Sequence, residues 1–351
     1  MPPIDQPAPE LAALLTGEQR IDFLTLTGFL GSGKTTLLNR LLQDARMSGS
    51  VILVNEFGAV AIDHLVVHQI TENIVLLRSG CVCCAVREDM VQALRDLYHQ
   101  VITGQLPPPA RVILETTGLA DPAPIAQTMM TDSFLLTRYA MKGIITCVDA
   151  VNGAHQLNAH AEARSQIKLA DALVVSKLDL VPGGAIPAEL RSRLGALNPK
   201  AQIVPADGMA ALGLFLEGFG EEASDQFHRW ADPSSTGAIG AAHKPHVKTL
   251  QIELEAPVDM DAFSVWLTKV LEAHGPDILR TKGILRAKGR AKPVLINGVH
   301  DVFYPPVELD GRAPDKSALL FILDTNAPAE VAEALRGFDP LNATGTLPRP
   351  F

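Results

Sequence analysis

The feature that most constrains the fold is a glycine-rich loop, Gly28–Thr36, which lies between an apolar run and a helix-like stretch. Its residues Gly28, Gly33, Lys34 and Thr35 fit the pattern G-x-x-x-x-G-K-[ST], in which backbone N–H groups surround the phosphates of a nucleotide. A strand, this loop and a helix follow one another in the order that the pattern requires. The sequence therefore predicts a P-loop protein, in preference to a glycine-rich turn that matches by chance.

Each residue type in the loop has a part in phosphate binding. Glycines let the backbone curl so that its N–H groups point at an anion, and the following helix adds its positive N-terminal end. Lys34 would reach the β- and γ-phosphates, and the Thr35 hydroxyl would bind Mg²⁺. We assign Lys34 a catalytic role as well. The predicted nucleotide ligands in the loop are Gly28, Gly31, Ser32, Gly33, Lys34, Thr35 and Thr36.

Composition narrows the class of protein. The 351 residues, 47% apolar and 20% charged, are enough for about two globular domains with packed cores. A net charge of -9 argues against binding to a nucleic-acid backbone. The first ten residues have no apolar signal core, and the longest apolar run, Ala318–Leu323, is too short to span a bilayer. We expect a cytoplasmic protein with neither a nucleic-acid nor a membrane partner.

The chain divides into two segments of different pattern. In residues 20–217, strand-like runs alternate with helix-like runs, which predicts an α/β domain with a mostly parallel sheet flanked by helices. Residues 218–246 have the composition of a linker, and residues 247–340 predict a smaller C-terminal α+β domain. Its predicted strands are 247–255, 278–286, 293–304 and 318–323, and its predicted helices are 259–274 and 328–338.

Two further strand ends carry residues suited to nucleotide chemistry. Glu115 ends an apolar strand at the place of a Walker-B acid, which faces the Mg²⁺ of the nucleotide, and the Gly118 amide would sense the γ-phosphate. The alternative is a surface acid that caps a strand. We predict catalytic roles for Glu115 and Gly118 beside Lys34.

Ser176-Lys177-Leu178-Asp179, at the end of another strand, resembles the [NST]-K-x-D element of GTPases. The Asp179 carboxylate would accept hydrogen bonds from guanine N1–H and the 2-amino group. Adenine offers neither donor, so a buried carboxylate would stay unpaired against it. Lys177 would lie along the base and ribose. We predict that Ser176, Lys177 and Asp179 read the base of GTP, although an ordinary strand end would also fit so short a pattern.

Three cysteines within four residues, Cys81, Cys83 and Cys84, predict a metal site. Thiolates are soft ligands that favour Zn²⁺ and also bind Co²⁺. Redox thiols or buried structural cysteines are the alternatives. Glu56, after the second strand, is a further candidate metal ligand, and Thr35 is the candidate ligand of Mg²⁺. Cys147 lies inside an apolar strand and is expected to belong to the core.

Together these motifs resemble one family, the CobW-like metallochaperone GTPases, which are related to the urease and hydrogenase nickel-insertion GTPases. The resemblance rests on the phosphate loop, N-E-F-G, G-C-V-C-C, E-T-T-G-L-A-D-P, V-D-A and S-K-L-D, and on the spacing of Gln166, Ala170 and Asp171 before the last of them. In the second segment, residues 279–284 and 297–300 are similar too. The likeness covers roughly residues 22–323.

The resemblance implies a GTPase whose C-x-C-C metal site and nucleotide site are coupled through switch segments. It implies delivery of zinc or cobalt to a client metalloprotein or to an enzyme of metal-cofactor biosynthesis, and it leaves a homodimer open. Many relatives carry a His-rich loop or tail, which this chain lacks, so a metal store is not expected. Residues 323–326 also depart from the Gly-Arg that commonly ends the last strand.

Two other functions compete with this one. An ATP-using P-loop enzyme with a redox thiol cluster would not need Asp179. A non-catalytic, metal-responsive adaptor would use nucleotide only to hold its shape. Affinity for ATP against GTP, with and without Zn²⁺ or Co²⁺, separates the three hypotheses.

Overall fold

The computed structural model describes residues 14, 19–54, 74–76, 85–217, 247–303, 305–309, 315–324 and 326–338. The chain divides into two compact units, each with a sheet of its own. The predicted linker 218–246, residues 339–340 of the second predicted domain, and four predicted metal ligands (Glu56, Cys81, Cys83 and Cys84) lie outside the described residues.

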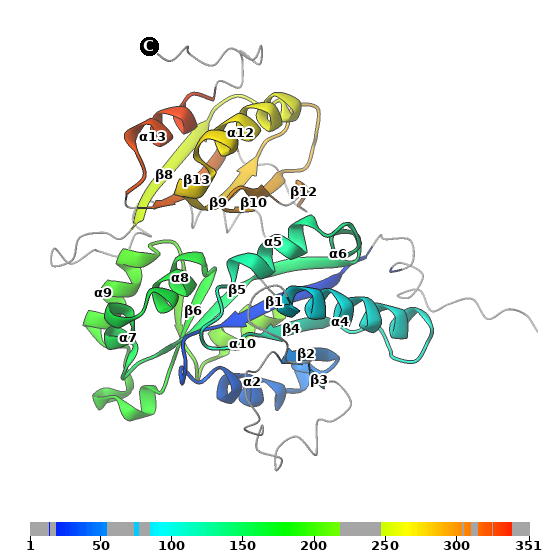
Figure 1. Cartoon of the computed structure of the whole chain (residues 1–351), viewed down its shortest axis with the longest axis vertical. Helices are drawn as coiled ribbons and strands as arrows, with labels where there is room; N and C mark the ends of the chain where they lie inside the picture. Colours follow the sequence, from blue (N-terminus) through cyan, green and yellow to red (C-terminus); the bar gives the residue numbers. More distant parts are fainter. Residues whose placement is uncertain are drawn as a thin grey trace, which may run out of the picture. The chain divides into compact units, whose positions relative to one another are not determined.

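The first unit is built on a seven-stranded sheet in which every pair of neighbours is parallel (Figure 1). The strand order is β3-β2-β4-β1-β5-β6-β7. The predicted α/β pattern with a mostly parallel sheet is confirmed. The strands are β1 (Ile21–Thr27), β2 (Ser50–Val54), β3 (Ile74–Leu76), β4 (Arg111–Glu115), β5 (Tyr139–Asp149), β6 (Ala172–Ser176) and β7 (Gln202–Pro205).

Helices follow most of these strands, as parallel connections require. The helices are α2 (Lys34–Leu42), α4 (Ala85–Ile102), α5 (Ala123–Thr131), α6 (Ser133–Arg138), α7 (Gly153–Ala159), α8 (Ala161–Leu169), α9 (Ala188–Leu197) and α10 (Met209–Glu217), with 3₁₀ turns η1 (Ala45–Met47), η2 (Leu178–Leu180) and η3 (Pro182–Gly184). The apolar stripe of α4, including Met90 and Leu94, packs with α5 and α6 against one face of the sheet. Strands β2 and β6 are buried along their whole length, as strands covered on both faces are.

Because the sheet is parallel, the carboxyl ends of its strands share one edge. The phosphate loop follows β1 there, Glu115 ends β4, and Ser176 ends β6. Strand β3 ends at the same edge, and the sequence between Leu76 and Ala85 contains Cys81, Cys83 and Cys84. Open parallel sheets bind their ligands at this edge, so the fold gathers the predicted nucleotide residues on the functional side.

The second unit has an antiparallel, six-stranded sheet in the order β11-β10-β9-β13-β8, with β12 paired to β10. Helices α12 (Met260–His274) and α13 (Ala329–Arg336) pack on it through a core that contains Phe263, Trp266 and Phe338. The remaining elements are β8 (Val247–Leu254), η5 (Gly275–Asp277), β9 (Ile278–Leu285), β10 (Val294–Val299), β11 (Val302–Phe303), β12 (Val307–Glu308) and β13 (Ser317–Asp324). The predicted fold class, an α/β domain and a smaller α+β domain, is confirmed.

One predicted strand of the second unit is wrong. Within the predicted strand 293–304, residues 294–303 form a hairpin, in which β10 ends at Val299 and β11 begins at Val302. The turn is possible because His300 adopts a left-handed conformation, with φ of 52°. Gly298, His300 and Asp301 interrupt the apolar pattern here, but the prediction included them in one strand. Among the helices that the structure describes, none combines the length and the apolar character needed to cross a bilayer.

Candidate nucleotide-binding site

The phosphate loop has a backbone that its glycines make possible. Gly28 has φ of 143°, and a Cβ atom added there would lie 2.3 Å from the backbone oxygen of Cys147. Gly33, with φ of 89°, caps the start of α2 in the left-handed region. The first turn of α2 contains no acidic residue. The N-terminal end of this helix therefore keeps its positive potential for an anion.

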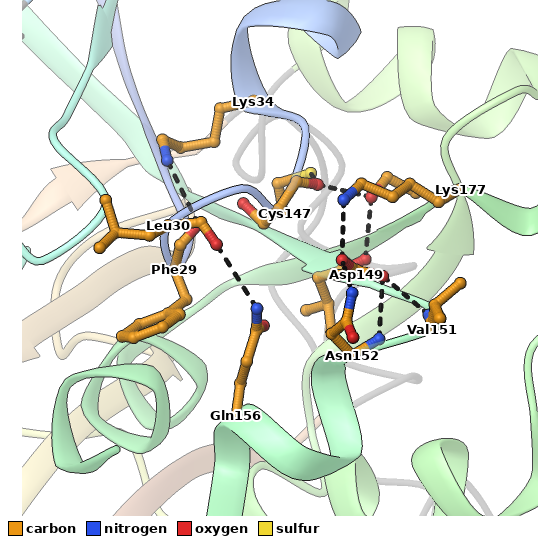
Figure 2. Close-up of polar contacts among 12 residues, drawn as sticks. Phe29, Leu30, Lys34, Cys147, Asp149, Val151, Asn152, Gln156 and Lys177 are labelled. Carbon is orange, nitrogen blue, oxygen red and sulfur yellow. Dashed lines mark hydrogen bonds and ion pairs between the residues drawn. The ribbon is translucent and has the colours of Figure 1, made fainter. Parts of the chain in front are cut away.

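Lys34 lies across the loop that precedes it. Its Nζ donates a hydrogen bond to the backbone oxygen of Gly28 at 2.9 Å. It also donates to the backbone oxygen of Phe29 at 3.5 Å (Figure 2). The side chain is almost buried, with 9% of the residue exposed. The ammonium is thus held at the loop whose N–H groups would bind phosphate, where a cation stabilises negative charge most effectively.

Thr35 and Glu115, 80 residues apart in the sequence, meet at the edge of the sheet. The Thr35 hydroxyl donates to Glu115 Oε1 at 2.6 Å. Two further contacts join the ends of β1 and β4, because Thr116 N donates to the Leu26 oxygen and its hydroxyl donates to Thr27 Oγ1. A hydroxyl beside a buried carboxylate is a pair of hard oxygen ligands of the kind that suits Mg²⁺.

Ser176 is tied to the phosphate loop. Its hydroxyl donates to the Ser32 oxygen at 2.5 Å, and the Cys147 thiol donates to the same oxygen at 3.0 Å. Burial raises the pKa of Cys147 to about 11, so the thiol keeps its proton at neutral pH and remains a donor. The predicted base-reading strand β6 and the phosphate loop are therefore joined through one carbonyl group. The prediction that Cys147 belongs to the core is confirmed.

Lys177 is paired with Asp149, at the end of β5. Its Nζ lies 2.8 Å from Asp149 Oδ2, and the carboxylate also accepts from the backbone N–H groups of Val151 and Asn152 and from the Asn152 side chain (Figure 2). Burial alone would raise the pKa of Asp149, but these hydrogen bonds, led by that of Lys177, outweigh it and hold the pKa below its usual value. Lys177 itself adopts a left-handed φ of 57°.

The remaining predicted residues have simpler surroundings. Asp179 is exposed in η2, and Thr36 is exposed on α2. Gly118 packs on the phosphate loop, since a Cβ atom added to it would lie 2.7 Å from the backbone nitrogen of Leu30. No group of three His, Cys, Asp or Glu residues that would suit a metal is found within the described part of the chain, which omits Cys81–Cys84.

Sequence reasoning missed two parts of the site. Asp149 was noted only as part of the V-D-A motif, and its contact with Lys177 depends on the pairing of β5 with β6. Cys147 was assigned to the core, without a contact to the loop. An acid at the end of another parallel strand was the only signal that the sequence offered for Asp149.

Comparison with known proteins decides the family. Residues 22–205, more than half of the chain, match the model of the CobW/HypB/UreG nucleotide-binding domain. The chain belongs to the CobW/HypB/UreG family. Residues 247–339 also match the cobalamin synthesis protein cobW C-terminal domain. The predicted membership is confirmed over both units.

Two curated relatives of this CobW-type chain cover most of it. The zinc chaperone YjiA of Escherichia coli K12 is 33% identical over 286 residues, which are 79% of this chain and 86% of that protein. The zinc-regulated GTPase metalloprotein activator 1 of Schizosaccharomyces pombe is 32% identical over 315 residues, which are 79% of this chain and 75% of that protein.

Solved structures agree with the sequence relatives. The crystal structure of Zn(II)-bound YjiA GTPase from E. coli has a TM-score of 0.62 to this CobW-type chain at 26% identity, and covers 91% of this chain and 99% of that one. By family and by fold the protein is thus a P-loop GTPase, as the sequence predicted.

Proposed function

We propose that the protein is a GTP-hydrolysing metallochaperone, which binds zinc or cobalt at Cys81, Cys83 and Cys84 and delivers it to a client in a nucleotide-dependent way. The client would be a metalloprotein or an enzyme of metal-cofactor biosynthesis in the cytoplasm. The contact of Thr35 with Glu115 beside Lys34 carries the nucleotide part of the proposal. The names of the two relatives, a zinc chaperone and a zinc-regulated GTPase metalloprotein activator, support the metal part.

The residues at the sheet edge suit a nucleoside triphosphate. The loop N–H groups and Lys34 would bind the β- and γ-phosphates. In hydrolysis, water attacks the γ-phosphorus, the bond to the β–γ bridging oxygen breaks, and GDP leaves with that electron pair. Lys34 and the Gly118 N–H would stabilise the negative charge that develops on the phosphate oxygens. Thr35 and Glu115 would hold Mg²⁺, which when bound neutralises phosphate charge.

The metal part rests on chain order and on thiolate chemistry. The segment with the three cysteines runs from the carboxyl end of β3 to α4, and Glu56 follows β2. Strand β2 lies between β3 and β4, and β4 carries Glu115. A change near the γ-phosphate thus has a short route, through β4 and β2, to the proposed metal ligands. Ordering of switch segments by the γ-phosphate would tighten the metal site, and hydrolysis would loosen it.

The proposal is tested by titrating Zn²⁺ or Co²⁺ into the full-length protein with a non-hydrolysable GTP analogue and Mg²⁺, with GDP, and without nucleotide. We expect tighter metal binding with the GTP analogue, by about 5–150-fold, which is the range of ordinary allosteric coupling. Linkage requires metal to tighten binding of the analogue by the same factor.

Cysteine variants serve as the controls. In Cys83→Ser and Cys84→Ser the nucleotide effect on metal binding should disappear, whereas Ser264→Ala, on the exposed face of α12 in the second unit, should keep it. Three superimposable metal isotherms for the unmodified protein would contradict the metallochaperone proposal. The protein would then be a GTPase in which metal binding by the thiol cluster does not depend on the nucleotide.

Guanine preference gives a second prediction. We expect Asp179→Asn to reduce the ratio of GTP to ATP affinity by about 10–100-fold, since an amide cannot accept two charge-assisted hydrogen bonds from guanine. The same variant should gain affinity for xanthosine triphosphate, because the amide N–H can donate to the oxygen at position 2 of xanthine. Competition with a fluorescent nucleotide measures all three affinities.

Asp96→Asn, the same change on the exposed face of α4, is the matched control, because an asparagine there still accepts the hydrogen bond from Gln92. Equal affinity of the unmodified protein for GTP and ATP would count against Asp179 as the base reader. A nucleotide site that contains Glu115 but does not distinguish GTP from ATP would favour the alternative of an ATP-using enzyme.

A further inference from the structure

A single buried side chain holds the loop that follows β4. Gln166 of α8 donates from Nε2 to the backbone oxygen of Ala120 at 2.9 Å and to that of Gly118 at 3.3 Å. The residue is completely buried. Since both neighbours are carbonyl oxygens, only the NH₂ end of the carboxamide can face them. Its other end, Oε1, has no hydrogen-bond partner among the described residues.

Gly118 contacts the phosphate loop as well as Gln166. A Cβ atom added to Gly118 would lie 2.7 Å from the backbone nitrogen and from the Cα of Leu30, so the two backbones touch. Glycine has more conformational freedom than any other residue. The orientation of the peptide groups around Gly118 therefore depends on outside contacts, and Gln166 provides the side-chain contact to its carbonyl.

Gln166 is itself held in place by β5. The Thr146 hydroxyl donates to the Gln166 backbone oxygen at 2.9 Å. Just beyond α8, Asp171 accepts from the Ile144 N–H at 2.7 Å, so both contacts attach the end of α8 to the same strand. A side chain on an element fixed in this way can position a loop with the precision that catalysis demands.

We propose that Gln166 is a positioning residue, which fixes the Gly118 loop against the phosphate loop and thereby sets the rate of GTP hydrolysis. This inference rests on the proposed function, in which the Gly118 N–H stabilises the γ-phosphate. Donors that are already oriented lower the barrier most, so loss of the contact should act on kcat. The phosphate loop and Lys34 provide most of the ground-state affinity, so the dissociation constant of GTP should change little.

The helix that bears Gln166 also leads directly into β6, which ends at Ser176 beside Lys177. Residues 166–177 thus form one continuous stretch of chain between the side chain that contacts Gly118 and the residues proposed to read guanine.

The test uses Gln166→Met, which keeps the length of the side chain without its hydrogen bonds, in the full-length protein. We expect kcat to fall about 10-fold, the effect of one hydrogen bond of about 1.4 kcal/mol, with GTP affinity within about 2-fold of the unmodified protein. Gln166→Asn, which keeps the amide but loses its reach, should show the same division between kcat and affinity. If Gln166→Met does not fold, Gln166→Asn tests the positioning role in its place.

A second readout does not depend on activity. In the protein without nucleotide, hydrogen exchange of the amides of residues 117–121 should be about 10-fold faster in Gln166→Met, because the loop opens more readily. Gln105→Met, in the exposed loop before β4 at the opposite edge of the sheet, is the matched control and should change neither readout.

The outcomes separate the two proposals. Unchanged exchange at residues 117–121 in a folded Gln166→Met variant would overturn the positioning role. So would equal losses in kcat and in GTP affinity, which indicate a structural role only. An unmodified protein that does not hydrolyse GTP would overturn the proposed function instead, while the exchange measurement would still decide the role of Gln166.

Discussion

Lys34→Ala is expected to lower kcat for GTP by at least about 10²–10³-fold, the usual cost of removing a group that stabilises transition-state charge. The ammonium lies at the phosphate loop, 2.9 Å from the Gly28 oxygen, so its removal takes a positive charge from the place where the γ-phosphate would bind. Binding of the triphosphate should weaken as well, by about 2–3 kcal/mol, as for loss of a hydrogen bond to a charged group. Single-turnover hydrolysis and nucleotide titration measure the two effects.

Two variants make this expectation specific. Lys34→Arg keeps the charge but places a planar group in an almost buried position, and should also be strongly impaired. Lys288→Ala removes one exposed charge from the second unit and should leave turnover unchanged. Near-normal turnover by a folded Lys34→Ala protein would show that this loop does not take part in GTP hydrolysis.

Gly28→Ala should produce the largest loss of stability among loop variants. The new Cβ would lie 2.3 Å from the Cys147 backbone oxygen, and this oxygen belongs to the core of the sheet, so it cannot move freely. We expect a loss of about 2–4 kcal/mol in the free energy of unfolding, typical of overpacking with backbone strain. In a domain of this size the midpoint of thermal unfolding should fall by about 5–15 °C.

Gly31→Ala is the matched control, because Gly31 is also left-handed, with φ of 69°, but has nothing within 4 Å of an added Cβ. It should cost only the strain of a left-handed residue, about 1–2 kcal/mol. Thermal unfolding followed by circular dichroism compares the two variants directly. Equal losses would mean that φ, and not the contact with Cys147, determines the effect at Gly28.

The sequence predicted the sheet of the first unit well, because strands covered on both faces are short apolar runs without polar alternation. Residues 172–175 are an example, and all of them are buried in β6. The hairpin of β10 and β11 was missed, although Gly298, His300 and Asp301 interrupt the apolar pattern there. Its turn depends on a positive φ at His300, a conformation that is uncommon for a residue other than glycine.

The candidate site was predictable where strand ends alone determine it. Thr35 and Glu115 were each predicted from their motifs to face the Mg²⁺ of the nucleotide, and they make contact. The contact of Asp149 with Lys177 and that of Gln166 with Gly118 could not be foreseen. They depend on the register between strands and on how α8 packs against β5, which a single sequence does not encode in any local pattern.

The strand order has a consequence for synthesis of the protein. Strand β1 is made first, but it pairs only with β4 and β5. Its partner on β4 emerges from the ribosome about 90 residues later, which takes roughly 5–20 s at ordinary translation rates. During that interval β1, which contains Ile21, Phe23, Leu24 and Leu26, has neither of its neighbouring strands, and the phosphate loop has no scaffold. Nucleotide therefore cannot assist folding until β4 and β5 have been made, and this waiting period is where the chain is most exposed to aggregation.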